Sequence, residues 1–199
     1  MAEMFASRNF YVNGVADVRY AWCVDCGAQY NGVSTTSITG LQHLEGATVA
    51  VLADGGVQAS KVVTNGSITL DNAASIVTVG LPYVCQLQTL RIDRGEPTPL
   101  GKRKKISRVS LLIEDTRGLA IGPMRETTDG TLVVGKMTHL KERSNQAWGM
   151  PVALKTGIES LLISPQWQLD GAIFIEQDKP LPATVLAVVP DVLMGDDAG

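Results

Sequence analysis

The amino-acid sequence predicts an all-β protein made of two small β-barrel or sandwich-like modules. Residues 41–90 contain β-branched runs that glycine-containing turns interrupt about every eight to ten residues. The pairs Asp54-Gly55 and Asn65-Gly66 separate apolar runs, and such pairs favour tight hairpins because both residues accept positive φ. No stretch of about ten residues keeps the i, i+3, i+4, i+7 spacing of an amphipathic helix without Gly or Pro. The sequence therefore indicates hairpins rich in Gly, Asn and Asp rather than helices.

The composition fits a folded, turn-rich chain. Of 199 residues, 45% are hydrophobic, 19% are charged and 20 are Gly, which argues against disorder and allows a real core in one or two domains. The net charge of -3 identifies no class of partner, although the low charge suggests that neighbouring subunits cover part of the surface. No apolar run is long enough for a membrane span, and residues 1–13 lack the apolar core of a signal peptide.

The first module is expected over residues 17–92, after an N-terminal arm at 1–16 to which no firm element is assigned. Residues 17–26 alternate Val18, Tyr20, Trp22 and Val24 with polar or small residues, which predicts a half-buried strand. Gly27 and the hairpin signal Asn31-Gly32 are expected to break this strand. Further strands follow at 47–53, 61–64, 67–70, 75–81 and 84–92.

An exposed connection is predicted at residues 93–104, where two prolines, two glycines and six charges occur together. The second module then covers residues 105–199. Its first strand, 105–116, has an irregular apolar phase that indicates a β-bulge. Further β runs are expected at 131–140, 158–163, 171–177 and 183–192.

The sequence shows no catalytic, cofactor or metal constellation. Cys23 and Cys26 have the C-x-x-C spacing, but residues three apart on a strand face opposite sides, and no second ligand pair occurs. An odd total of three cysteines, with Cys85, favours a reducing compartment over a disulfide framework. Neither His43 nor His139 lies near a nucleophile motif, and His43 is expected to bond a turn carbonyl or a carboxylate. We therefore predict a non-enzymatic protein.

Two groups of residues are candidates for contacts with partners. The run Lys102, Arg103, Lys104 and Lys105 is the most concentrated charge and is a candidate DNA-facing or subunit-bridging patch, with a solvated loop as the plainer alternative. No aromatic residue interleaves this run, which argues against stacking on single-stranded bases. Trp148 and Trp167 are candidate interface anchors, with core packing as their alternative.

Three stretches carry a resemblance to a known family. They are the opening His43-Leu44-Glu45-Gly46 with the Ala53-Asp54-Gly55 turn and the closing run 79–83 (VGLPY), the basic entry 101–106 (GKRKKI), and the terminal pair 175–190 (IEQDKPLPATVLAVVP). This set resembles the nozzle, or tail tubular, proteins of short-tailed phages, and the likeness spans about residues 20–192. Within 175–190, Pro180 and Pro182 fix φ and stop ladder pairing, which predicts a sharp turn before the last apolar strand.

The resemblance implies a structural virion protein of the phage tail, assembled in the host cytoplasm. It implies a homo-oligomeric ring around the channel of DNA ejection, with the adaptor or portal and the fibres as partners and non-specific contact with genomic DNA. Family members are longer chains whose earlier part attaches to the portal or adaptor, and this sequence lacks that part.

Two other functions stay open as alternatives. A β-sandwich module that binds a host-surface carbohydrate is the second, although the ten aromatic residues do not cluster in the sequence. A cell-wall hydrolase is the third, and it would need convergent carboxylates, for which only Glu45, Asp54 and Glu114 stand out.

Overall fold

The computed structural model describes residues 10–92, 101–127, 129, 131–142, 152–164, 167–169 and 171–195. In these ranges the chain is all-β, as predicted, and its helical elements are two 3-10 turns, η1 (Val18–Tyr20) and η2 (Gln42–Leu44). No helix in the same ranges is long and apolar enough to cross a membrane. The chain forms two compact units: unit 1 lies within residues 1–84, 142–154 and 178–182, and unit 2 within 85–141, 155–177 and 183–199.

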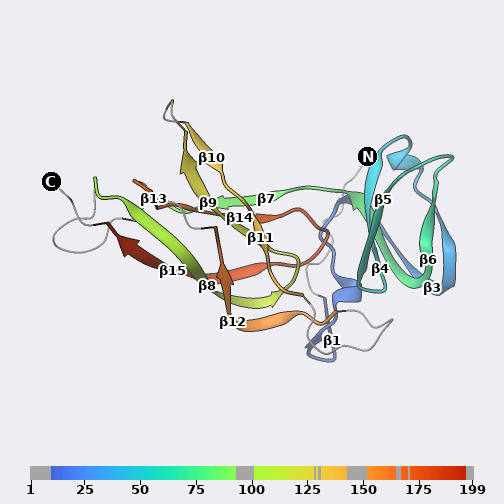
Figure 1. The fold of residues 1–199 in the computed structure, drawn as a ribbon. Coiled ribbons are helices and arrows are strands. Elements are labelled where there is room, and N and C mark those ends of the chain that lie inside the picture. Colours follow the sequence, from blue (N-terminus) through green and yellow to red (C-terminus); the bar gives the residue numbers. More distant parts are fainter. Residues whose placement is uncertain are drawn as a thin grey trace. The chain divides into compact units, whose positions relative to one another are not determined.

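Unit 1 is organised around one antiparallel sheet (Figure 1). Its strands, in the order in which they pair, are β3 (Asp25–Thr39), β6 (Ser67–Leu81), β4 (Thr48–Ala53) and β5 (Gly56–Val62). The β-branched and leucine residues of these strands meet in one core, because alternate side chains of a strand face the same side. This core contains Ile38, Leu41, Leu44, Val49, Val51, Ala53, Val63, Ile68, Leu70, Ala74, Val77 and Val79.

Two of the three hairpin signals of unit 1 are confirmed. Asp54-Gly55 joins β4 to β5, and Asn65-Gly66 links the bridged residues Thr64 and Ser67, with positive φ at all four turn residues. Carboxylates stabilise both turns by accepting hydrogen bonds from main-chain amides. Asp54 accepts hydrogen bonds from the Ser75 and Ile76 amides, and Glu45 accepts from the Asn65 and Gly66 amides at 2.9 and 2.6 Å.

Two predictions in unit 1 are wrong. Residues 17–24 form no strand, because Asp17 caps η1 by accepting a hydrogen bond from the Arg19 amide. The buried residues here are Val18, Ala21 and Val24, which are three positions apart and not two as in a strand. Gly27 does not break a strand and Asn31-Gly32 makes no hairpin, because β3 continues through both with register shifts against β6. The Tyr30 side chain lies over Gly32 and its hydroxyl donates to the Val33 carbonyl at 2.8 Å, so this glycine makes room for a ring rather than a turn.

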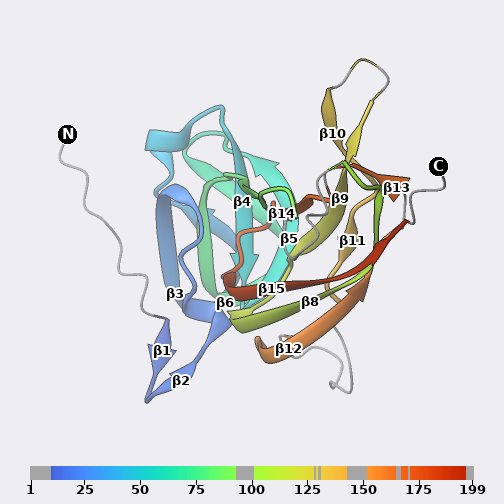
Figure 2. The same cartoon turned by 90° about the vertical axis from the view of Figure 1, so that its left-hand side faces the viewer.

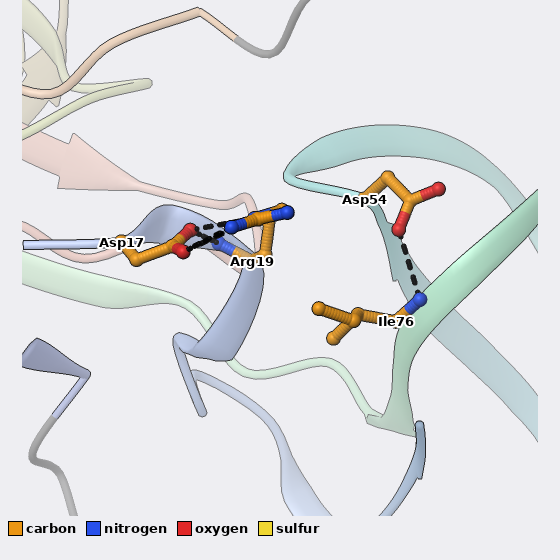
Figure 3. A network of polar contacts seen from close by, with 4 residues as sticks. All are labelled: Asp17, Arg19, Asp54 and Ile76. Carbon is orange, nitrogen blue, oxygen red and sulfur yellow. Dashed lines mark hydrogen bonds and ion pairs between the residues drawn. The ribbon is translucent and has the colours of Figure 1, made fainter. Parts of the chain in front are cut away.

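The cap of η1 is also a bidentate ion pair (Figure 3). The Arg19 Nε donates to Asp17 Oδ1 at 3.0 Å, and its Nη2 donates to Oδ2 at 2.6 Å. The hydrogen bond from the Arg19 side chain is the main cause that lowers the pKa of the Asp17 carboxyl, and burial opposes it. The same bond raises the pKa of Arg19.

We expect Asp17→Ala to destabilise unit 1 by about 1 kcal/mol at pH 7, because the helical turn loses its cap. Because the folded-state pKa of Asp17 is lowered, its stabilisation is present above the unfolded value near 3.9 and is lost as pH falls through the folded pKa. Asp17→Asn, which keeps a capping oxygen and loses the charge, is the control. Urea denaturation from pH 7 to pH 2 measures the free energy of unfolding of all three proteins. If the wild type stays more stable than Asp17→Asn below the folded pKa of Asp17, the ion-pair explanation is contradicted.

Unit 2 contains two sheets (Figure 2). In the first sheet the strands pair in the order β10-β9-β14-β7, and β11 also pairs with β9. In the second sheet β8 is central, with β12 and β13 along one edge and β15 along the other. Their bounds are β7 (Cys85–Gln88), β8 (Lys104–Thr116), β9 (Ala120–Glu126), β10 (Leu132–Val134), β11 (Thr138–His139), β12 (Lys155–Leu162), β13 (Trp167–Gln168), β14 (Ile173–Gln177) and β15 (Thr184–Met194). The core contains Ile106, Val109, Leu111, Ile113, Leu119, Ile121, Leu140, Leu161, Ile163, Ile173 and Ile175.

The units differ from the sequence-based modules at three places. Strand β7 pairs with β14 and belongs to unit 2, although the sequence placed it in the first module. Among the described residues, 142, 152–154 and 178–182 return to unit 1. The predicted connection 93–104 ends within β8, and its residues 93–100 lie outside the described residues. Pairing between strands that are distant in sequence determines these boundaries, and local turn signals do not indicate which strands pair.

Most strands predicted for the second half are confirmed. The runs at 105–116, 158–163, 171–177 and 183–192 correspond to β8, β12, β14 and β15, and β8 carries the expected irregularity as register shifts against both neighbours. The run at 131–140 is divided into β10 and β11. Strand β9 has no sequence-based counterpart, since Gly122 and Pro123 interrupt its apolar pattern.

Candidate functional site

The cysteines and histidines do not converge. None of the three cysteines, all of which the structure describes, forms a disulfide, and no group of three or more His, Cys, Asp or Glu residues in the described ranges is placed to hold a metal ion. The His43 Nε2 lies 2.9 Å from the Cys26 carbonyl oxygen, so this histidine bonds a main-chain carbonyl, which belongs to strand β3 and not to a turn. Glu45 and Asp54 are engaged by turn amides of unit 1.

The structure corrects the predicted basic patch at one residue. Lys104 is 1% exposed, and its Nζ donates to the Leu169 carbonyl at 2.8 Å. Alternation along β8 explains the difference, because Lys104 points into the unit 2 core while Lys105 points to the opposite side. Arg103 is exposed, and Lys102 and Lys105 are half-buried. The run is therefore not a continuous exposed charge.

Trp167 lies beside the basic run. It pairs with Lys105 in the β13–β8 register, and the Lys105 Nζ is 5.9 Å from the centre of its ring, a cation–π contact. The side chain remains 48% exposed. The sequence named both residues without connecting them. Trp148, the other predicted anchor, lies outside the described residues.

Trp167 and Lys105 belong to a larger surface, the side of the β12–β8–β15 sheet that faces away from the core. Figure 2 shows these three strands side by side, β12 in orange, β8 in yellow-green and β15 in dark red. Seven large apolar residues of this side are exposed, and we call them the apolar face: Leu112, Ile158, Leu162, Trp167, Leu186, Val189 and Leu193.

Strand register orders the apolar face into cross-strand rows. Reading from β12 or β13 across β8 to β15, the rows are Ile158-Leu112-Ala187, Ser160-Ser110-Val189, Leu162-Arg108-Asp191 and Trp167-Lys105-Leu193. The Ser110 and Ser160 hydroxyls share a hydrogen bond of 2.9 Å. The first two rows carry no charge, and the last two carry Arg108, Asp191 and Lys105. On the same side, Glu114 is exposed on β8 two residues beyond Leu112 and pairs with Thr184 of β15. The face thus has an uncharged half, made of the first two rows, between Glu114 and the charged half made of the last two rows.

The exposed apolar area of the apolar face is large for a surface that is in contact only with solvent. With roughly 100–150 Å² for a fully exposed aliphatic side chain and about 200 Å² for Trp, the exposed fractions correspond to on the order of 500 Å². This is near the upper end for the largest patch on a monomer, about 300–600 Å². It also matches the apolar share of one partner's side of a standard interface, since that side is about 800 Å² and roughly 57% apolar.

The sequence contains a signal for this face that the predictions did not use. Strand β8 contains Leu111-Leu112-Ile113, β12 ends at Leu161-Leu162 and is followed by Ile163, and β15 has the run 185–189 (VLAVV). Consecutive apolar residues in a strand indicate that both sides of the sheet are covered. In unit 2 the core covers one side, and the other is the apolar face.

Sequence comparisons add no relative. No model of a known protein family matches the chain, and no curated protein matches it significantly. The geometry of the apolar face and the chemistry of its residues are therefore the observations that bear on function.

Proposed function

We propose that this chain is a non-catalytic structural subunit that assembles with copies of itself into a ring, as a component of a phage tail nozzle. The observation that carries the proposal is the apolar face, whose exposed apolar area on one sheet matches the apolar area of one side of a standard interface. The resemblance to nozzle proteins supplies the setting, the virion tail.

The composition of the face also supports subunit contact. Trp and Arg carry much of the binding energy in many interfaces, and the face holds Trp167 and Arg108 among aliphatic side chains. Closed cyclic symmetry would cover such a face on every copy. It would also protect the edge strands that a β-rich monomer exposes.

A carbohydrate-binding module fits this surface less well. Sugar rings stack on open aromatic faces, and the Lys105 ammonium already lies over the Trp167 ring. The other side chains of the face are mostly aliphatic.

The first test is the mass of the purified full chain in solution, measured by light scattering over a range of concentrations at low and high salt. We expect one discrete oligomer that persists in high salt, because salt screens ion pairs but does not weaken apolar burial. Negative-stain images should show a closed ring with a central opening. A monomer at every concentration, or an open chain of copies, contradicts the proposal.

We expect Ile158→Glu to weaken association at least tenfold, about 1.4 kcal/mol, because it places a charge in the uncharged half of the face. Ile158 is 75% exposed, so the monomer should keep its unfolding midpoint. Val33→Glu is the matched control: Val33 is 85% exposed on β3 of unit 1 and is not a member of the apolar face. An Ile158→Glu oligomer as stable as that of the Val33 variant excludes this face as the interface.

A further inference from the structure

A second exposed apolar element lies in unit 1. Strands β1 (Tyr11–Val12) and β2 (Val15–Ala16) form a two-stranded sheet of their own, joined by Asn13 and Gly14 with φ of 51° and 79°. These angles belong to a type I′ turn, the tight turn that suits a hairpin. The hairpin projects from the main sheet of unit 1 (Figures 1 and 2).

The base of this hairpin is fixed to unit 1. Phe10 packs against the buried cluster Val18, Ala21, Leu52 and Leu181, and its ring stacks on Tyr11 at 5.4 Å between centroids. The Asp17 amide donates to the Phe10 carbonyl at 2.9 Å, and the Asp17 side chain is held by Arg19. The hairpin is therefore a preorganised arm, which lowers the entropic cost of docking.

The tip of the hairpin is apolar and uncharged. Tyr11, Val12 and Val15 are 47%, 42% and 69% exposed, and residues 10–16 contain no charged side chain. A hairpin of two strands is only marginally stable in water unless it packs on another surface. Its exposed apolar side chains amount to on the order of 200 Å². This area fits within the uncharged half of the apolar face, where Ile158, Leu112 and Val189 lie.

Copies of one chain supply hairpins and apolar faces in equal number. A face-to-face dimer uses the apolar face of both copies and makes no use of the hairpin. A contact of hairpin with face uses two different surfaces, is heterologous, and closes into a ring when the rotation is right. We propose that the β1–β2 hairpin of each copy docks on the uncharged half of the apolar face of the next copy. This inference rests on the proposed function, because it specifies how the ring would form.

The test is crosslinking of co-expressed single-cysteine chains with a short bismaleimide. The background carries Cys23→Ala, Cys26→Ser and Cys85→Ser, and light scattering checks that it assembles as the native chain does. One chain carries Val15→Cys and the other Ile158→Cys. We expect a covalent dimer from the mixture and none from either variant alone. Replacing Ile158→Cys with Val33→Cys is the matched control and should give no dimer.

Each other result overturns the inference in a distinguishable way. A covalent dimer from Ile158→Cys alone means that faces meet each other in a two-fold pair. It removes the hairpin contact and leaves self-association through the apolar face standing, and the light-scattering mass then decides whether a ring forms. An oligomeric mass without any crosslink removes the hairpin contact only, whereas a monomeric mass without crosslinks removes the proposed function as well. Val15→Asp in the native-cysteine chain is an independent check. It should weaken association at least tenfold relative to Val33→Asp with an unchanged unfolding midpoint, and equal association of the two contradicts the docking.

Discussion

Lys104→Glu is expected to destabilise unit 2 by about 3–5 kcal/mol, the usual cost of a buried charge without a partner. Lys104 is 1% exposed, and its ammonium donates to the Leu169 carbonyl. A carboxylate at this position has no proton to donate and faces the lone pairs of that carbonyl. Lys104→Met should cost less, about 1–3 kcal/mol, because it keeps an apolar stem beside Gly171 and loses the hydrogen bond. Chemical denaturation followed by tryptophan fluorescence measures both.

Lys105→Glu is the control for this prediction. It is the next residue of the same strand with the opposite orientation, and its loss removes a cation–π contact worth about 0.5–1 kcal/mol. The two Glu variants have the same composition and net charge. Similar losses from both would show that net charge, and not burial of Lys104, governs the effect.

The fold class and the tight turns could be predicted because their signals are local. Asp54-Gly55 and Asn65-Gly66 have the backbone freedom that a type I′ turn demands, and each separates two apolar runs. The strands of unit 2 with strong apolar runs, such as β8 and β15, were also predictable. In these cases the residues that decide the structure are neighbours in sequence.

The errors have a common physical cause, which is packing between distant residues. Residues 17–24 alternate like a strand, yet Asp17 and Arg19 favour a capped turn and Ala21 is buried completely. Asn31-Gly32 has the composition of a hairpin, but pairing with β6 keeps β3 extended. Strand β7 is placed by β14, which lies far away in the sequence. Local propensity is a weak guide where tertiary pairing competes with it.

The candidate site was predictable only in part. Trp167 and Lys105 were named for separate reasons, and the fold brings them together on one face. The grouping of Lys104 with Lys105 was wrong, because adjacent residues of a strand face opposite sides. The aliphatic members of the face were not identified, since a sequence of consecutive apolar residues does not say which side the core occupies.

Leu111→Ala is expected to cost about 3 kcal/mol of folding free energy, with 2–5 kcal/mol as the usual range for a core leucine. Leu111 is 0% exposed in the unit 2 core, between Glu159 of β12 and Val188 of β15 in the register. Its removal leaves a cavity that three paired strands cannot close easily. Urea denaturation should show a lower midpoint with an unchanged slope.

The matched variant Leu112→Ala removes the same atoms from the opposite side of the same strand. Leu112 is 39% exposed on the apolar face, so we expect its loss to cost under about 1 kcal/mol of folding free energy. Light scattering should instead show weaker association, which Leu111→Ala leaves unchanged under conditions where that variant is folded. Equal folding losses from the two variants would mean that both sides of the sheet are packed within one chain, and the apolar face would then have no surface to offer a second copy.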